Sequence, residues 1–267
     1  MLFRSLEYSN NYLVVSDSNT TAVYMYKKDD SDNFEFFQKM TGWDGNSSSH
    51  GSYGVGLAIS SNFLFVGQKV GNNGAIDVFK KTDNVDEWVY KTRISSSTVG
   101  QTSPSNMTNF SRAFDIYNDT TLIVGVSNLT ENSTTYPDGQ GGFIPYTTSD
   151  GGSSWTKGTI VYAPSSQNNS RFGDDITIYG DYIAVTESNK TNTGTTKTGT
   201  SYIYKTTDSG VSWSKQDELL PASVPQNNNV NPIAFYNNYV FPTSTGSIYG
   251  FKKDRKSTRL NSSHQII

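Results

Sequence analysis

A short apolar run recurs five times along this 267-residue chain at nearly constant spacing. Two clear copies are Asn62-Phe-Leu-Phe-Val-Gly67 and Asp181-Tyr-Ile-Ala-Val-Thr186. The apolar anchors of the five copies are Leu13, Leu64, Leu122, Ile183 and Val240, which are separated by 51, 58, 61 and 57 residues. A repeat of this length is typical of a propeller blade or a solenoid unit, so it constrains the fold more than any single motif.

Three further runs accompany each anchor. An alternating run, such as Ile176-Thr-Ile-Tyr179, precedes the anchor after a short polar turn, which is the pattern of a β-hairpin. A third run follows and carries an aromatic residue in every repeat, at Tyr26, Phe79, Tyr146, Tyr204 and Phe251. A fourth run begins at Phe34, Trp88, Trp155 and Trp213, and the fifth repeat shows none. Aromatics make up 13% of the chain, which also favours strands over helices.

Four antiparallel strands cannot cover both of their faces alone, and a propeller solves this by packing successive sheets against one another. We therefore predict an all-β chain: a β-propeller with four nearly complete four-stranded blades and a partial fifth. A linear solenoid and an array of sandwiches are the alternatives. The expected blades span about residues 1–40, 53–94, 111–161, 171–220 and 231–253.

Both ends of the sequence suggest a fragment of a larger propeller, with residues 1–253 as the propeller part. The stretch Asp254–His264 differs in character from the rest and resembles a translated sequencing adapter. That resemblance implies that residues 254–267 are an artefactual, disordered tail. An ordinary basic tail is the alternative.

Composition excludes several functions. A net charge of −3 and a pI near 5.4 give no footprint for nucleic acid. The chain has no cysteine and only two histidines, His50 and His264, which argues against a histidine-rich metal site and a Ser-His-Asp triad. It also has no 18-residue apolar run that would predict a membrane span, and no cofactor motif. We expect no catalytic residues, no metal and no cofactor.

Two segments share the pattern Ser/Thr-x-Asp-x-Gly-x-Ser/Thr-Trp and resemble the Asp-box hairpins of sialidases and other propellers. An aspartate in this position can accept hydrogen bonds from backbone N–H groups two or three residues on, and the glycine supplies positive φ. The tryptophan is expected to pack beneath the turn. We assign these residues a structural role at the hairpin between third and fourth strands: Asp150, Gly152, Trp155, Asp208, Gly210 and Trp213.

Phe172-Gly173, followed by an alternating strand and an Asp181-Tyr-Ile-Ala-Val run, resembles the FG-GAP repeat of integrin-α-type propellers. Tyr53-Gly54 opens a second, looser copy. Many members of that family carry an Asp-x-Asp-x-Asp-Gly calcium loop. The nearest segment here, 29–33, lacks the glycine, so calcium binding is not carried over.

Candidate binding residues fall at strand starts and at one loop tip. Arg4, Arg112 and Arg171 lie near the starts of first strands, and sialidases hold their substrate's carboxylate with three arginines. A catalytic Tyr–Glu pair cannot be placed, and solvated arginines are the alternative interpretation. Tyr136 and Asp138 occupy the one aromatic-bearing tip among the long loops.

The sequence therefore favours a non-enzymatic binding or adhesion module over an enzyme. We expect it at the cell surface or outside the cell, with its loop face binding a protein or a glycan. This rests partly on analogy between folds. The alternatives are a fragment of a sialidase-like glycoside hydrolase and a purely structural repeat array.

Overall fold

The structure is a computed structural model that describes most of the chain. The described residues are 3–17, 22–42, 52–70, 73–83, 86–99, 108–131, 135, 139–165, 167–193, 196–197, 199–219, 231–236, 239–244, 247–253 and 260–266. Within them every regular element is a β-strand except two single-turn 3-10 helices, η2 (Ser96–Val99) and η3 (Thr108–Ser111). The all-β prediction is confirmed.

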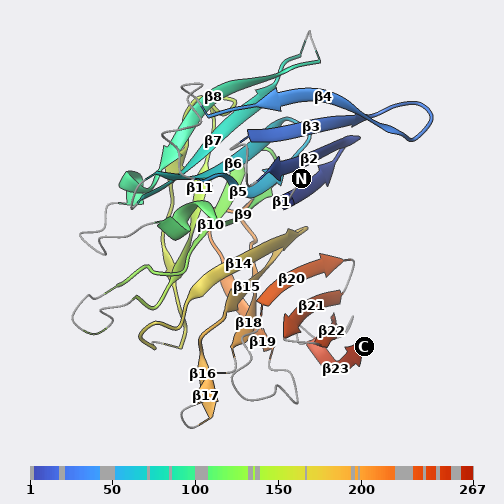
Figure 1. The fold of residues 1–267 in the computed structure, drawn as a ribbon. Coiled ribbons are helices and arrows are strands. Elements are labelled where there is room, and N and C mark those ends of the chain that lie inside the picture. The colour runs from blue at the N-terminus through green and yellow to red at the C-terminus, as the bar shows by residue number, and fades with distance from the viewer. Residues whose placement is uncertain are drawn as a thin grey trace. The chain divides into compact units, whose positions relative to one another are not determined.

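Apart from one two-stranded hairpin, the described strands form five antiparallel sheets that follow one another along the chain (Figure 1). The first sheet contains β1 (Phe3–Ser9), β2 (Tyr12–Asp17), β3 (Ala22–Lys28) and β4 (Phe34–Met40). The second contains β5 (Ser52–Ile59), β6 (Phe63–Val70), β7 (Asn73–Lys81) and β8 (Trp88–Ser95). The third contains β9 (Ala113–Tyr117), β10 (Thr121–Val126), β11 (Gly142–Thr147), β12 (Thr156–Lys157) and β13 (Val161–Tyr162).

The remaining two sheets repeat the same order. The fourth contains β14 (Phe172–Tyr179), β15 (Tyr182–Glu187), β18 (Thr200–Lys205) and β19 (Ser214–Leu219). The fifth contains β20 (Asn231–Tyr236), β21 (Tyr239–Ser244), β22 (Ser247–Lys253) and β23 (Leu260–Ile266). A small hairpin, β16 (Thr191–Thr193) with β17 (Thr196–Lys197), lies between β15 and β18. The chain is thus a five-bladed β-propeller of small sheets, as predicted.

The five apolar anchors occupy equivalent places. Each lies in the second strand of its sheet, in β2, β6, β10, β15 and β21. The predicted aromatic of the third strand sits directly opposite the anchor in four sheets: Leu13 with Tyr26, Leu64 with Phe79, Ile183 with Tyr204, and Val240 with Phe251. The repeat in the sequence therefore corresponds to a repeated register between the second and third strands of these sheets.

Two details differ from expectation. The fifth sheet has a fourth strand, because β23 pairs with β22 from Lys253 to Ile248. This strand lies inside the stretch expected to be a disordered tail, of which residues 254–259 fall outside the described part. The fourth strand of the third sheet is split, because β12 and β13 pair with opposite ends of β11.

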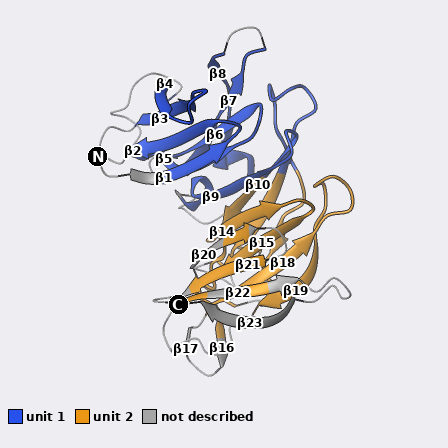
Figure 2. Ribbon diagram, turned by 90° about the vertical axis from the view of Figure 1, so that its right-hand side faces the viewer, with its two compact units in different colours: residues 1–100, 105–122, 146–157 blue, residues 101–104, 123–145, 158–267 orange. Residues whose placement is uncertain are grey.

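The chain divides into two compact units (Figure 2). Unit 1 comprises residues 1–100, 105–122 and 146–157, and unit 2 comprises residues 101–104, 123–145 and 158–267. The third sheet contributes residues to both.

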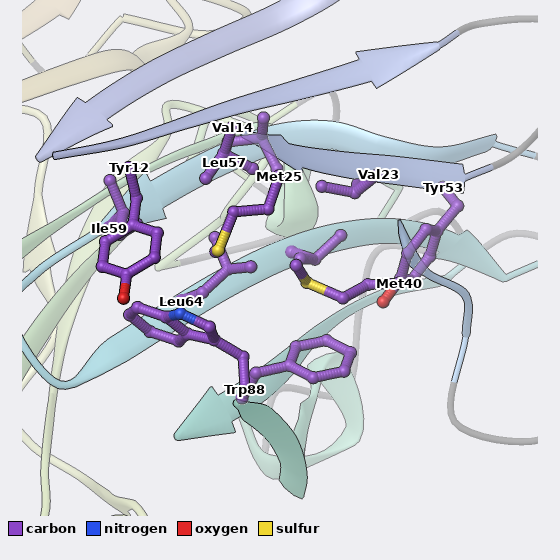
Figure 3. Close-up of a cluster of buried hydrophobic side chains, with 12 residues drawn as sticks. Tyr12, Val14, Val23, Met25, Met40, Tyr53, Leu57, Ile59, Leu64 and Trp88 are labelled. Carbon is purple, nitrogen blue, oxygen red and sulfur yellow. The ribbon is translucent and has the colours of Figure 1, made fainter. Parts of the chain in front are cut away.

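Apolar side chains between the first and second sheets form the core of unit 1 (Figure 3). Tyr12, Val14 and Met25 come from the first sheet, and Leu64 and Trp88 from the second. The rings of Tyr12 and Trp88 meet edge to face, with centroids 5.5 Å apart. Such pairs add about 0.5–1.5 kcal/mol to the burial of the rings themselves.

Small residues at the ends of the second strands are explained by close backbone contacts. A Cβ on Gly67 of β6 would lie 2.0 Å from the Ser111 carbonyl oxygen, and one on Gly125 of β10 would lie 2.2 Å from the Gly173 carbonyl oxygen. At the equivalent place in β2, Ser16 is accommodated because the residue that approaches it is Gly54, which has a φ of +74°. Blades can approach this closely only where one partner lacks a side chain.

Candidate functional site

Each sheet has two ends, and the candidate site lies at what we call the loop end, where the second strand runs into the connection to the third. The fourth residue after the anchor is buried and polar in three sheets: Asp17, Gln68 and Glu187. Buried polar groups require partners, so this recurrent position organises polar networks.

The largest network lies in unit 2 around Glu187, the last residue of β15. Its carboxylate is fully buried and accepts hydrogen bonds from the Tyr202 hydroxyl at 2.7 Å and from the Ser165 hydroxyl. Burial and the negative charge of Glu187 raise the pKa of Tyr202. Tyr202 therefore remains a neutral hydrogen-bond donor at neutral pH.

Two lysines continue this network. The Lys190 ammonium lies 2.8 Å from the Tyr202 hydroxyl and forms an ion pair with Glu218. Lys215 binds the other oxygen of Glu218 at 2.9 Å and lies 4.6 Å from the centroid of the Tyr202 ring. Burial alone would raise the pKa of Glu218, but the hydrogen bonds from the two lysines outweigh it and lower that pKa.

A second acid–base pair lies beside this network at the start of β14. Arg171 donates to Asp174 at 2.8 Å, and the Ser188 hydroxyl donates to the other oxygen of Asp174 at 2.7 Å. The register of β14 against β15 shifts between Phe172 and Ile176, so Asp174 lies in an irregular part of the strand. Such irregularities redirect side chains and are common next to active sites.

The backbone at Arg171 is strained, with a φ of +61°. A positive φ is uncommon for a residue with a side chain, and strained residues concentrate at functional sites. Arg171 and Asp174 are also partly open to solvent, with 35% and 20% of their side chains exposed. They are accessible where Glu187 and Tyr202 are not.

Unit 1 carries different chemistry at the equivalent register. By strand register, Asp77 of β7 occupies the place that Tyr202 has in β18. In the neighbouring fourth strands, Arg93 of β8 occupies the place that Glu218 has in β19. Arg93 donates to both oxygens of the fully buried Asp77, at 2.7 and 3.1 Å, and to the Gln68 side chain at 2.6 Å. This bidentate geometry is the strong form of an ion pair.

The opposite end of the first two sheets holds a cavity of about 390 Å³. Asp86 lines it and accepts hydrogen bonds from Tyr12 and Lys27, with the Lys81 ammonium 3.2 Å away. Burial alone would raise the pKa of Asp86, but these donors lower it to about 2. A carboxylate this acidic is a weak proton acceptor, which disfavours Asp86 as a general base.

In both Asp-x-Gly hairpins the aspartate accepts a backbone hydrogen bond, but from the residue four positions on rather than two or three positions on as expected. Asp150 accepts from the Ser154 N–H at 3.0 Å, and Asp208 accepts from the Ser212 N–H at 2.9 Å. Gly152 and Gly210 have φ values of +85° and +89°.

The two tryptophans of these hairpins differ. The Trp213 indole donates to the Gly210 carbonyl of its own turn at 3.0 Å. Trp155 instead packs edge to face on Phe63 and Phe65 of the second sheet, with centroids 5.9 and 5.3 Å away. Trp155, which directly precedes β12 of the third sheet, therefore links that sheet to the second.

The predicted binding residues do not gather into one described site. Arg171 belongs to the Asp174 pair, Arg112 is exposed, and the side chain of Arg4 lies outside the described residues. Tyr136 and Asp138 also lie outside them. The sequence predictions did not include Glu187, Tyr202, Lys190 and Asp174. Glu187 could have been found, because the fourth residue after the anchor is also polar in the first two repeats.

Among the described residues, no group of three or more His, Asp or Glu side chains could hold a metal ion. No helix in this part of the chain is long and apolar enough to cross a membrane.

The chain matches no protein-family model and no curated protein. Its likeness to solved structures is extensive but distant. A candidate 6-phosphogluconolactonase from Bacteroides fragilis matches 96% of this chain at 14% identity with a TM-score of 0.59. A candidate 6-phosphogluconolactonase from Bacteroides uniformis matches 98% at 11% identity with a TM-score of 0.60.

A third neighbour is the periplasmic gluconolactonase PpgL of Pseudomonas aeruginosa, with 96% of this chain matched, 11% identity and a TM-score of 0.58. The chain spans about two thirds of the length of these proteins: 67%, 70% and 66%. At such low identity the likeness shows the propeller fold alone.

These comparisons correct the functional expectations. The predicted non-enzymatic adhesion module and its sialidase-like alternative are both contradicted, because the neighbours just described are named as lactonases. The sequence also favoured a protein that is not an enzyme, and the same finding contradicts this expectation. The FG-GAP and Asp-box resemblances find no matching family, and the cell-surface location stays a prediction.

Proposed function

We propose that this chain is part of a β-propeller lactonase that hydrolyses a small sugar lactone. The observation that carries the proposal is the match of 96–98% of the chain to propellers named as lactonases. The resemblance to FG-GAP and Asp-box propellers is kept only as a proposal about the hairpins, which would serve to close the blades.

Lactone hydrolysis needs two groups from the protein. A base accepts a proton from the attacking water, and a donor stabilises the negative charge that develops on the carbonyl oxygen. Asp174 and Arg171 meet these needs, because they are a carboxylate and a guanidinium in contact, both partly open to solvent.

In the proposed reaction, Asp174 carries the proton that moves and Arg171 stabilises the negative charge. Water adds to the lactone carbonyl while Asp174 takes its proton and Arg171 holds the oxyanion. The tetrahedral intermediate then collapses with cleavage of the ring C–O bond, and the ring oxygen leaves with the proton that Asp174 returns. The product is the open hydroxy acid.

The buried network around Glu187 would act as the support of this pair. Glu187 ends β15 and is followed directly by Ser188, whose hydroxyl donates to Asp174. Hydrogen bonds from Tyr202 and Ser165 hold the Glu187 carboxylate in place. Groups fixed in this way hold a reacting pair in productive geometry.

The test measures hydrolysis of glucono-1,5-lactone and its 6-phosphate by acid release, after subtraction of the uncatalysed rate. We expect Asp174→Asn to lower kcat/KM about 100-fold or more, as for loss of a general base. Arg171→Lys keeps the charge but loses the planar fork, and should lower kcat/KM by at least about 10-fold.

Two matched variants control for nonspecific effects. Asp30→Asn changes an exposed aspartate after β3, and Arg112→Lys changes an exposed arginine. Both should retain the wild-type rate. Failure of the wild-type chain to exceed the uncatalysed rate with either lactone would overturn the proposal, as would full activity of Asp174→Asn.

A further inference from the structure

The cavity of about 390 Å³ opposite the loop end belongs to unit 1 alone, because every residue that lines it lies in that unit. Its volume falls in the range of about 300–1,000 Å³ that is usual for small-molecule sites. Tyr12 of β2 and Lys27 of β3 come from the first sheet, whereas Lys81 of β7 and Asp86, just before β8, come from the second. The cavity is therefore built between two sheets of one unit.

The equivalent place between the second and third sheets is filled by a turn of unit 1. Phe63 begins β6 as Tyr12 begins β2. Trp155 packs on Phe63 edge to face. Trp88 packs on Tyr12 in the same way (Figure 3). Beside Phe63 the turn of the third sheet approaches so closely that a Cβ on Gly152 would lie 2.3 Å from the ring. The space that a turn fills in one pair of sheets is thus a cavity in the other.

The lysines at this register have different surroundings in the two pairs of sheets. Lys27 is opposite Tyr12, and Lys80 is opposite Phe63. The Lys80 ammonium lies 5.9 Å from the centroid of the Phe63 ring, and a Cβ on Gly151 of the turn would lie 3.2 Å from it. Lys27 instead lines the cavity. A place where one repeat departs from the next is a candidate for a functional site.

Two ammonium groups converge in the cavity. Lys27 forms an ion pair with Asp86, and the Lys81 ammonium lies 3.2 Å from the same carboxylate. The hydrogen bond with Asp86 raises the pKa of Lys27, and the hydrogen bond with Tyr12 raises the pKa of Lys81, so both lysines are cations at neutral pH. Their two positive charges exceed the single negative charge of Asp86. Because each ammonium has three N–H donors, a second anionic group can bind beside Asp86.

Polar side chains suited to hydroxyl groups also line the cavity. Asn11 and Asp83 are two of them, and neither side chain forms a hydrogen bond or an ion pair with another described residue. An amide can donate and accept, and a carboxylate accepts. These are the partners that the hydroxyls of a ligand require.

We propose that this cavity binds a small hydroxy acid. The carboxylate of the ligand would lie against Lys27 and Lys81, and its hydroxyls would bind Asn11 and Asp83. The proposal goes beyond the lactonase activity proposed above, because binding here involves no turnover and uses neither Asp174 nor its partners. Gluconate carries a carboxylate and several hydroxyls, so it serves as the probe.

The test is isothermal titration calorimetry with gluconate at low ionic strength. Lys27→Met and Lys81→Met each remove one ammonium and keep an unbranched side chain. Each should raise the Kd for gluconate at least about 10-fold, as for the loss of a charge-assisted hydrogen bond. Lys80→Met removes the lysine at the register equivalent to Lys27, away from the cavity, and should leave the Kd unchanged. Melting temperatures confirm that each variant folds.

Two further probes define the ligand class. Glucose lacks the carboxylate and inorganic phosphate lacks the hydroxyl-bearing chain, so each should bind at least about 10-fold more weakly than gluconate. Glucose or phosphate that binds as tightly as gluconate would overturn the proposal, as would the absence of saturable gluconate binding or equal effects of Lys27→Met and Lys80→Met.

A last variant separates this cavity from the proposed lactonase site. Asp174→Asn should bind gluconate with the wild-type Kd. If it weakens binding while Lys27→Met and Lys81→Met do not, gluconate occupies the lactonase site and the present proposal fails. A failure of this kind leaves the rate measurements proposed for lactone hydrolysis unaffected, so the two proposals stand or fall separately.

Discussion

Replacing Gly67 with alanine tests the close packing of successive blades. Gly67 lies within β6 and is opposite Ile76 of β7, so the sheet restrains its backbone on that side. The added Cβ would lie 2.0 Å from the Ser111 carbonyl oxygen. Because the obstacle is backbone rather than a flexible side chain, rotation about a side-chain bond cannot relieve the contact.

The expected cost follows from this overlap. Overpacking destabilises proteins by about 1–3 kcal/mol, and a backbone clash belongs at the upper end. For a chain of this size about 3 kcal/mol lowers the melting temperature by roughly 6–12 °C. Thermal unfolding followed by circular dichroism and tryptophan fluorescence measures the shift.

Gly158→Ala is the matched control. The nearest atom to its Cβ would be the Pro145 carbonyl oxygen at 3.2 Å, so a small local adjustment suffices and the melting temperature should fall by less than about 4 °C. Gly125→Ala should repeat the large effect in unit 2. A Gly67→Ala protein that melts within about 2 °C of wild type would refute the close approach of the blades.

Three further outcomes are expected. Trp155→Ala removes the contact with Phe63 and should cost about 3–5 kcal/mol in urea unfolding, while a cost below about 1 kcal/mol would contradict its role between sheets. Arg93→Met leaves Asp77 buried without its bidentate partner and should cost about 3–5 kcal/mol, part of which Asp77→Asn in the same chain should restore. Hydrogen bonds from Ser212 lower the pKa of Asp208 to about 2, so its contribution to stability is present above the ordinary value of 3.8 and is lost as the pH falls towards 2. The stability difference between wild type and Asp208→Asn should therefore shrink between pH 5 and pH 2, and a constant difference would refute the hydrogen-bonded geometry.

The sequence could predict the blades because their register repeats. Leu64 and Ile183 lie opposite Phe79 and Tyr204, so a constant spacing of apolar anchors carried real information on strand pairing. The strand β23 was missed because its residues, Leu-Asn-Ser-Ser-His-Gln-Ile, have little of the aromatic and apolar pattern of the other strands.

The candidate site could not be predicted in the same way, because register repeats while chemistry does not. The place that holds Asp77 in the second sheet holds Tyr202 in the fourth, and the partner changes from Arg93 to Glu218. No sequence motif predicts that Asp77 pairs with Arg93 or that Tyr202 lies opposite Glu218. Their partners also come from loops, as Ser165 does for Glu187, and loop contacts have no periodicity to follow.

Hydrogen exchange measured by mass spectrometry tests the five-blade account most directly. The second and third strands are interior in every sheet and are hydrogen-bonded on both sides, whereas the first and fourth are edges. Amide protection should therefore peak five times, around Leu13, Leu64, Leu122, Ile183 and Val240, with minima at the connections between sheets. Protection that lacks this spacing, or that is as strong in the edge strands as in the second strands, would contradict the account.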